Sequence, residues 1–311
     1  GSVSPLALDY RLALAALGAP PEPLHPLGFS SLQAGLYATL RALGVGPGSE
    51  VLCDPLFPFA ALVVLHAGGR PRFPMLDDQG PVPRVEAWRA ALRAGVEVIV
   101  ATVPFGVDAD VATLGDEAPL VLDLAHAMPE PVEHTGAAAV GFSFAHGKPI
   151  DAGEGGLILF GSDELRNLAH AWSCFGILPD GAQQRGIPGL NLRPNPILPS
   201  LVVAGRARLE GLIGAVSAAG EELGLQLRNH GAQPLPRSQA LCWQHPFLFP
   251  LRALPPGEIQ ADGIVFKRCR LSVTGAEIAM ESDAEARWRA RQMADRLYWY
   301  RPVLRPIWEE P

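Results

Sequence analysis

The feature that most constrains the fold is an alternation of short apolar segments with helical segments along the first half of the chain. Residues 31–43 carry leucines at helical spacing, and Ser30 or Ser31 can cap the first turn. The apolar segments have the length of buried strands and lie at 50–53, 96–103, 120–123, 141–144 and 156–160. This alternation predicts an open α/β sheet with helices on both faces. Ligands of such sheets bind beyond the carboxyl ends of the strands.

The pattern changes after residue 200. Residues 198–225 form one stretch rich in alanine, leucine and glycine, which predicts a long helix. Prolines then interrupt 233–263, and a charged amphipathic helix is expected over 283–300. We therefore expect two domains, a large α/β domain over residues 1–205 and a smaller α+β domain over 206–311.

Composition excludes several classes of protein. With 48% hydrophobic and 18% charged residues, the chain of 311 residues is not disordered. Its net charge of −7 argues against a general binder of nucleic acid or of anionic membranes. No apolar run reaches about 18 residues, and no basic stretch precedes an apolar core near residue 1. We therefore expect neither a membrane span nor a signal peptide.

The cysteines also favour a cytoplasmic protein. There are four, they form no C-x-x-C pair, and they lie far apart, at Cys53, Cys174, Cys242 and Cys269. This spacing is typical of reduced, mostly buried thiols rather than of a disulfide framework or a zinc site. We expect no metal.

Lysine is unusually rare in this chain. Lysine and arginine total 25, yet only Lys148 and Lys267 are lysines. Arginine stays protonated, whereas a lysine amine can lose its proton, attack a carbonyl and form an imine. A lysine retained in such a sequence is therefore a candidate for chemistry that arginine cannot perform. The alternative is that the two positions reflect chance, and we interpret Lys267 as surface charge.

Several polar residues fall where an α/β sheet presents its chemistry. Asp123 ends an apolar segment and is followed by His126. Ser143 lies in the next apolar segment, and Lys148 comes five residues later, before a GEGG turn at 153–156. Taken singly, they have ordinary explanations: a helix cap, a structural histidine, a serine bonded to the backbone and a turn that needs positive φ.

Taken together, these residues suit the cofactor pyridoxal phosphate. That cofactor needs an amine to carry its aldehyde, a carboxylate to keep its ring nitrogen protonated, and short donors to hold its phosphate. Lys148 supplies the amine, Asp123 the carboxylate and Ser143 a hydroxyl. The helix that starts near Ser31 offers free backbone N–H groups, with Gln33 in its first turn.

Four segments resemble one protein family. The segment GFSFAHGKPIDAGEGGLILF at 141–160 is similar to the F-S-F-x-x-x-K…G-[DE]-G-G segment of the DegT/DnrJ/StrS aminotransferases. The resemblance continues in 40–73, which contains the GVGPGSEV turn, in PLVLDLAHA at 119–127 and in GLNLRP at 189–194. It covers about residues 30–205 in order. It implies fold type I of the pyridoxal phosphate enzymes, with a large mixed, mostly parallel sheet and a small C-terminal α+β domain.

The resemblance also implies catalytic roles. Lys148 would form the Schiff base, an aldimine, with the cofactor and would later shuttle a proton. Asp123 would pair with the pyridine nitrogen, and His126 would sit near the phenolic oxygen. Phe59 would stack on the ring, with Phe57 as the less favoured candidate.

Further roles concern the phosphate and a second subunit. The resemblance implies that Ser143 binds the phosphate and that Asn191 reaches the phosphate of the neighbouring subunit. The active site would then lie at a homodimer interface. Leu32 and Gln33 stand where the family has a glycine and a hydroxyl residue, so phosphate binding would rely on the remaining N–H groups and on the Gln33 amide.

Substrate contacts depart further from the family. Where the family often has R-N-H-G, this chain has Ser173, Cys174, Phe175 and Gly176, so a basic contact is missing. The C-terminal part is also shorter than usual. Two arginines remain as candidate substrate contacts, Arg193 and Arg270. For Arg270 the expected ligand is the substrate carboxylate. For Arg270, and for Arg268 beside it, a solvated strand edge is the alternative that we favour.

The preferred hypothesis is an aminotransferase. It would move an amino group from an amino acid donor, plausibly glutamate, to a keto substrate, which for this family is mostly a keto sugar. Two alternatives remain open. One is a pyridoxal phosphate lyase, dehydratase or racemase acting on a small substrate. The other is a divergent pseudoenzyme with a regulatory or scaffold role.

Overall fold

A computed structural model of the chain describes ten stretches of residues. They are residues 25–57, 59–92, 95–107, 110–127, 136–229, 231–235, 245–248, 258–261, 264–268 and 284–302. Arg270 lies outside them, so its expected role stays a prediction.

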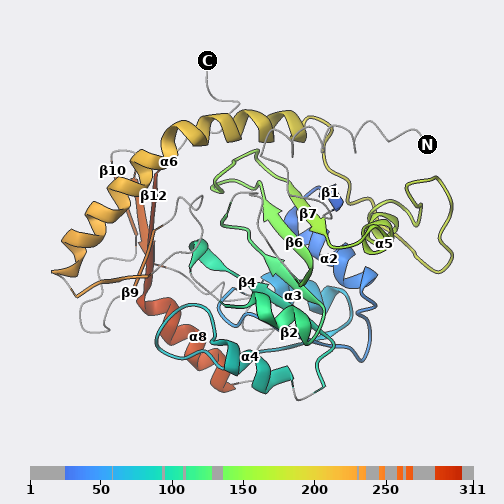
Figure 1. The fold of residues 1–311 in the computed structure, drawn as a ribbon, viewed down its shortest axis with the longest axis horizontal. Coiled ribbons are helices and arrows are strands. Elements are labelled where there is room, and N and C mark those ends of the chain that lie inside the picture. Colours follow the sequence, from blue (N-terminus) through green and yellow to red (C-terminus); the bar gives the residue numbers. More distant parts are fainter. Residues whose placement is uncertain are drawn as a thin grey trace.

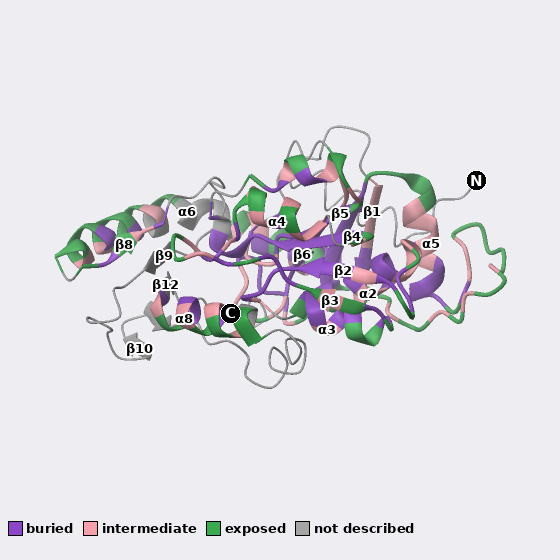
Figure 2. Cartoon of the chain, turned by 90° about the horizontal axis from the view of Figure 1, so that it is seen from below, coloured by how far each residue is buried: buried purple, intermediate pink, exposed green. Residues whose placement is uncertain are grey.

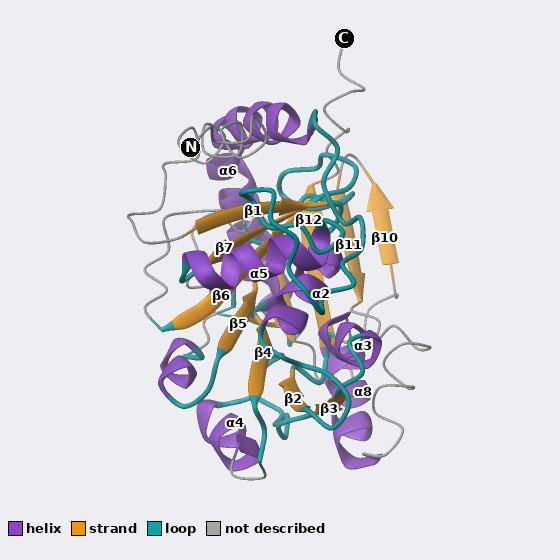
Figure 3. Ribbon diagram, turned by 90° about the vertical axis from the view of Figure 1, so that its right-hand side faces the viewer, coloured by secondary structure: helices purple, strands orange, loops and turns teal. Residues whose placement is uncertain are grey.

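Within the described residues, a sheet of seven strands forms the centre of the molecule (Figure 1). The strands are β1 (His25–Phe29), β2 (Glu50–Cys53), β3 (Arg70–Arg72), β4 (Val98–Thr102), β5 (Leu120–Asp123), β6 (Ala137–Ser143) and β7 (Gly156–Phe160). Their order is β1-β7-β6-β5-β4-β2-β3, and Figure 3 shows them following one another in this twisted row. Strands β2 to β6 pair in parallel, and β7 is antiparallel to both neighbours. The prediction of a mixed, mostly parallel sheet is confirmed.

Helices cover both faces of this sheet. They are α2 (Leu32–Ala42), α3 (Phe59–His66), α4 (Val85–Leu92) and α5 (Asp163–Ser173), with short 3-10 turns η1 (Pro104–Gly106) and η2 (Ala112–Asp116). Successive strand residues face opposite sides. Val100 packs in the cluster that includes residues of α2, α3 and α5, and Ile99 packs in the cluster that includes Trp88 of α4. Both faces of the sheet are therefore buried (Figure 2), which explains why the strand sequences are unbroken apolar segments.

The C-terminal part is built around a second sheet. Its elements are α6 (Leu198–Arg228), β8 (Gln233–Pro234), β9 (His245–Leu248), β10 (Glu258–Ala261), β11 (Ile264–Arg268), α8 (Ala284–Arg296) and β12 (Leu297–Pro302). In the described residues its five strands have the order β10-β11-β12-β9-β8 and pair antiparallel. This is an α+β arrangement, as expected. The expected domain boundary after residue 205 falls inside α6 and stays a prediction.

One expected helix is shorter than predicted. The sequence predicted a helix over 283–300, but α8 ends at Arg296 and β12 begins at Leu297. The aromatic run Tyr298, Trp299 and Tyr300 pairs with β11 on one side and β9 on the other. Aromatic residues favour strands, and here the tertiary pairing overrides the helical charge pattern. None of the described helices is long and apolar enough to cross a membrane.

Candidate active site

The carboxyl ends of four adjacent strands bring polar residues into one row. Ser143 is the last residue of β6, Asp123 of β5 and Thr102 of β4, and Asp54 directly follows β2. Thr102 and Asp123 face each other in the strand register. All four residues are buried. The row lies where an α/β sheet is expected to hold its ligand.

Asp123 is held in a defined orientation. Its Oδ1 accepts a hydrogen bond from the Ala125 N–H at 2.9 Å, and its Oδ2 lies 3.5 Å from the Thr102 hydroxyl. Burial raises the pKa of Asp123, whereas the Ala125 N–H, the charge of Lys148 and Thr102 lower it. Lys148 therefore lies close enough for its charge to lower the pKa of Asp123.

His126 lies in an aromatic cluster and is neutral. Burial, followed by the charge of Lys148, lowers its pKa well below the usual value. The Phe105 N–H donates to His126 Nδ1 at 3.3 Å, so the ring proton resides on Nε2. The Phe105 ring stacks on His126 with 4.7 Å between centroids and 2° between planes. His126 therefore offers an uncharged N–H donor at a fixed orientation.

Phe57 completes this aromatic cluster. It meets Phe105 and His126 edge-on, with centroid distances of 5.8 Å and 5.6 Å. Phe59, which was the expected stacking residue, begins α3 and is 49% exposed. The geometry thus places Phe57 beside His126 and places Phe59 at the surface. Phe105 was missed by sequence reasoning, and its φ of 56° marks an unusual backbone position for a bulky residue.

A candidate phosphate cradle forms where α2 meets the strand ends. Ser31 accepts a hydrogen bond from the Ala34 N–H and thereby caps α2. The N–H groups of Leu32 and Gln33 precede the first bond within the helix. Gly156, which pairs with Ser143, permits this approach, because a Cβ on it would lie 2.4 Å from the Leu32 nitrogen.

The side chain of Leu32 does not enter this cradle. It is buried against β6, where a Cβ on Gly141 would lie 2.6 Å from Leu32 Cδ1. Gln33 is exposed in the first turn. The departure from the family at Leu32 therefore places its bulk in the core and leaves the backbone N–H groups as the available donors.

Lys148 lies on the loop that joins β6 to β7. Its N–H donates to the Ala145 carbonyl at 3.1 Å, and Gly147 before it has a φ of 81°, which favours glycine. The charge of Lys148 lowers the pKa of both Asp123 and His126. The structure therefore brings these three predicted residues together.

Asp54 was missed by sequence reasoning. Its Oδ1 accepts hydrogen bonds from the N–H groups of Leu56 and Phe57, at 2.8 Å and 2.9 Å. Its buried Oδ2 has no hydrogen-bond partner among the described residues. Burial and the charge of Asp123 raise the pKa of Asp54 to about 7. The signal was available, because Asp54 follows an apolar strand just as Asp123 ends one.

Asn191 and Arg193 lie on an exposed segment near the start of α2. Arg193 Nε donates to Asn191 Oδ1 at 3.0 Å, and its guanidinium lies 5.4 Å from the centroid of Phe175. The Ser30 N–H donates to the Leu192 carbonyl at 2.8 Å, which ties this segment to α2. Their expected contacts with a second subunit and with substrate stay predictions.

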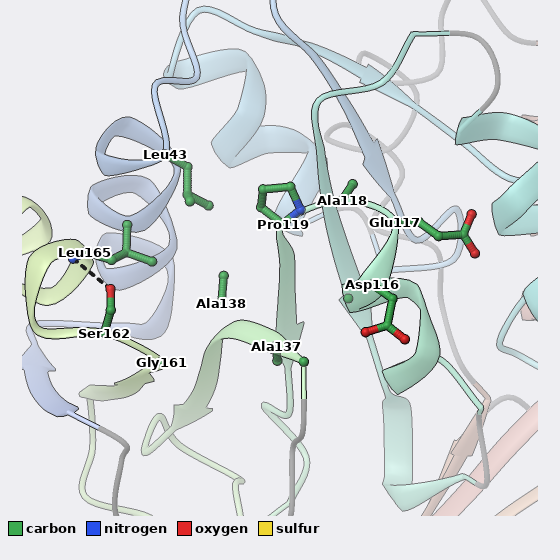
Figure 4. A pocket seen from close by; sticks show the side chains of 12 residues that line it. Leu43, Asp116, Glu117, Ala118, Pro119, Ala137, Ala138, Gly161, Ser162 and Leu165 are labelled. Atoms are coloured by element: carbon green, nitrogen blue, oxygen red, sulfur yellow. Dashed lines mark hydrogen bonds between the residues drawn. The ribbon is translucent and has the colours of Figure 1, made fainter.

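A pocket lies at the opposite end of the sheet. It has a volume of about 590 Å³ and opens where β5 and β6 begin. Figure 4 shows it between Leu43 and Leu165 on one side and the segment 116–119 on the other. The row of Ser143 and Asp123 is at the other edge of the sheet, so this pocket is separate from the candidate site.

Two relatives are similar to this chain in sequence. One is the spore coat polysaccharide biosynthesis protein SpsC of Bacillus subtilis, 30% identical over 49% of this chain and 42% of that protein. The other is a UDP-N-acetyl-3-dehydro-α-D-glucosamine 3-aminotransferase of Acidithiobacillus ferrooxidans, 31% identical over 45% of this chain and 41% of that protein. The matches thus span less than half the length of these relatives.

The fold itself has close structural counterparts. The aminotransferase TlmJ from Streptoalloteichus hindustanus superimposes with a TM-score of 0.77 over 96% of this chain and 85% of that chain, at 18% identity. This likeness confirms fold type I. The profile of the DegT/DnrJ/EryC1/StrS aminotransferase family matches residues 21–240, which is more than half of the sequence. This chain therefore belongs to the DegT/DnrJ/EryC1/StrS aminotransferase family.

Proposed function

We propose that the protein is a pyridoxal phosphate-dependent aminotransferase that takes an amino group from an amino acid such as glutamate and delivers it to a keto sugar. One observation carries the proposal. Asp123 ends β5, and Lys148 lies on the loop after the neighbouring strand β6, so an amine and a carboxylate converge at the strand ends. The charge of Lys148 lowers the pKa of both Asp123 and His126. Membership of an aminotransferase family supports it.

The residues present fit this cofactor. A cradle exists at Gly156, where a Cβ would collide with the first turn of α2. Ser143 and the N–H groups of Leu32 and Gln33 would hold the phosphate, as helix N-termini commonly do. Asp123 would hold the proton of the ring nitrogen. The site thus offers anion-binding groups for the phosphate and an acidic group for the ring nitrogen, as the cofactor requires.

Each side chain has a defined task in the proposed reaction. When bound, pyridoxal phosphate supplies an electron-withdrawing ring that stabilises charge on the substrate α-carbon. Lys148 Nζ holds the cofactor and then moves the proton of the donor's α-carbon. Proton transfer by a positioned amine contributes about 10²–10⁴-fold to the rate. His126 Nε2 would donate a hydrogen bond to the ring oxygen of the cofactor.

The stacking role passes from Phe59 to Phe57 in this proposal. Phe57 lies against His126, whereas Phe59 is half exposed. A ring held edge-on to His126 can close one side of the site and exclude water. Phe57→Ala is therefore expected to weaken cofactor binding more than Phe59→Ala does.

The test uses the two lysines of the chain. Purified protein is mixed with pyridoxal phosphate, reduced with borohydride and digested, and the peptides are weighed. We expect the label on Lys148, no label in Lys148→Ala, and unchanged labelling of Lys148 in the control Lys267→Ala. Labelling elsewhere, or retention of the visible absorbance in Lys148→Ala, would contradict the proposal.

A half-reaction separates a transaminase from other enzymes that use the cofactor. Without acceptor, a transaminase converts glutamate to 2-oxoglutarate in an amount equal to the enzyme. A lyase, dehydratase or racemase does not. Candidate keto sugars are then screened as acceptors against the aminated enzyme, starting from nucleotide-linked sugars. The printed name of the Acidithiobacillus relative supports that choice.

We also propose a homodimer that works in the cytoplasm. Support for the dimer is the exposed segment of Asn191 and Arg193 beside α2, which the family resemblance places at a subunit contact. The described cysteines Cys53 and Cys174 are free and buried, which suits a reducing compartment. Light scattering tests the dimer, and mixed dimers of Asn191→Ala with Lys148→Ala test whether Asn191 acts across it.

A further inference from the structure

The loop that carries Lys148 is closed by its own backbone. The Phe144 N–H donates to the Gly155 carbonyl at 2.9 Å, and the Ala152 N–H donates to the Phe144 carbonyl at the same distance. Further along, the His146 N–H donates to the Gly153 carbonyl at 3.0 Å. The loop has two arms: the first begins directly after Ser143, and the second ends directly before Gly156. These bonds join the two arms, and Lys148 lies between the arms in the chain.

One carboxylate joins both arms of this loop. Asp151 is buried, and its Oδ2 accepts the Gly147 N–H at 2.9 Å. Its Oδ1 accepts the Gly153 N–H at 3.1 Å. His146 Nδ1 lies 2.8 Å from Oδ2. Three nitrogens therefore converge on one side chain.

This arrangement requires a carboxylate. Both backbone partners are donors, so the group between them must accept with both of its ends, and an ionised carboxylate has only acceptors. An asparagine would turn one oxygen into an NH₂ that faces an N–H group. The His146 side chain is 72% exposed, so its own contribution is screened by water.

We propose that Asp151 is a positioning residue for Lys148. The inference rests on the proposed function of Lys148. Asp151 fixes Gly147, the residue directly before Lys148, at a φ of 81° and links it to the second arm. The direction in which Lys148 leaves the loop thereby becomes fixed relative to Ser143 and Gly156. Asp151 touches neither cofactor nor substrate and acts through Lys148.

The first test measures the amine without the cofactor. In a Lys267→Ala background, Lys148 is the only lysine, and its labelling by trinitrobenzenesulfonate is followed by peptide mapping. Asp151→Asn is compared with the parent and with His146→Gln, which keeps the buried carboxylate. We expect Asp151→Asn to change the labelling rate of Lys148 several-fold, while His146→Gln changes it less than twofold. Equal rates in all three proteins would overturn the inference.

The second test measures attachment of the cofactor. At saturating pyridoxal phosphate, we expect the rate of borohydride-trapped attachment at Lys148 to fall at least about tenfold in Asp151→Asn, because the bonds lost involve a charged group. The visible absorption maximum of the bound cofactor should shift too. Asp151→Glu restores an acceptor and should recover part of the rate. A purely structural role predicts a lower melting temperature with the wild-type rate and spectrum, and that result would refute the positioning role.

Failure of this inference is distinguishable from failure of the proposed function. If the parent protein attaches no cofactor at Lys148, the proposed function fails, and the labelling of the amine still tests Asp151. If the parent attaches it and Asp151→Asn does so equally fast, only the positioning role fails. Melting curves of each variant identify any protein that does not fold, and the milder Asp151→Glu variant then decides.

Discussion

Asp54 and Asp123 are two buried carboxyl groups at the ends of β2 and β5, and the charge of Asp123 raises the pKa of Asp54. The two groups differ in their other partners. Asp123 has the Thr102 hydroxyl and the charge of Lys148 beside it, whereas Asp54 Oδ2 has no hydrogen-bond partner in the described part of the chain. Asp123 therefore lies near a positive charge, whereas the raised pKa of Asp54 opposes its ionisation.

The first prediction concerns stability and Asp54. Its pKa is about 7 in the folded protein, against 3.8 for an unperturbed aspartate. Between these values the folded state binds more protons than the unfolded state, so the free energy of unfolding falls as pH rises through this window. Asp54→Asn removes this loss and keeps Oδ1 as an acceptor. We expect the free energy of unfolding to rise by up to about 4 kcal/mol at pH 8 and by less at pH 5.

Urea unfolding of the cofactor-free protein at both pH values measures this effect. Asp116→Asn is the control, because Asp116 is an exposed carboxylate in η2. That variant removes an exposed charge and should change the free energy of unfolding by no more than about 0.5 kcal/mol. A gain in Asp54→Asn that does not depend on pH would show that Asp54 is already ionised at pH 5 in the folded state, contrary to expectation.

The second prediction concerns the protonation of His126. Its pKa is well below 6.5, so the folded state keeps the ring neutral while the unfolded state binds a proton. The free energy of unfolding should therefore fall as pH drops below about 6.5. Nitrogen chemical shifts of the labelled ring should report the Nε2–H tautomer from pH 8 down to pH 6.

Two variants separate the donor of His126 from its ring. His126→Gln keeps a neutral N–H donor, and His126→Phe keeps an aromatic ring beside Phe105. We expect about tenfold weaker binding of pyridoxal phosphate in His126→Phe and a smaller loss in His126→Gln, because an unmade hydrogen bond costs about 1–3 kcal/mol. Equilibrium dialysis at pH 7.5 measures both. A larger loss of affinity in His126→Gln than in His126→Phe would show that the aromatic ring, rather than the N–H donor, supports cofactor binding.

The sheet was predictable because buried strands carry their own signal. Strands such as 120–123 are apolar on both sides, and a parallel sheet covered by helices requires that pattern. The length of the C-terminal helix was overestimated. The amphipathic pattern of 283–296 continues through Leu297, although that residue starts a strand. Pairing with β11 and β9 decides this, and no local pattern reports it.

The site was predictable only where chemistry and position coincide. Lys148, Asp123 and His126 could be proposed because an amine, an acid and a histidine lie at or after strand ends, and the structure brings them together. From sequence alone, Phe57 and Phe59 differ only in how the chain turns after β2, and the structure places Phe57 beside His126 and Phe59 at the surface. Asp151 was missed because loop carboxylates are common, and only the structure shows its three nitrogen partners.

The third prediction concerns Leu32. Its side chain is buried against Gly141, so Leu32→Ala leaves a cavity and should lower the free energy of unfolding by about 2–4 kcal/mol. The phosphate donors at this position are backbone N–H groups, which the substitution retains. Affinity for pyridoxal phosphate should therefore change less than twofold in the folded variant. Denaturant unfolding and dialysis check the two parts, and a large gain in affinity would show that Leu32 obstructs the cradle.

The fourth prediction concerns Gly156. A Cβ at this position would lie 2.4 Å from the Leu32 nitrogen and 2.6 Å from its Cα, and both are backbone atoms that cannot rotate away. Gly156→Ala should therefore push the first turn of α2 away from Ser143. We expect a loss of about 1–3 kcal/mol in stability and a larger relative loss of affinity for pyridoxal phosphate than for pyridoxal. The second comparison isolates the phosphate, because pyridoxal lacks it.

Gly214→Ala provides the matched control for this substitution. Gly214 lies in α6, and a Cβ there meets nothing within 4 Å. Alanine favours a helix, so this variant should gain up to about 1 kcal/mol and bind the cofactor unchanged. If Gly156→Ala loses stability but binds pyridoxal phosphate and pyridoxal in the wild-type ratio, then α2 does not hold the phosphate. The donors would then have to come from the loop after Ser143.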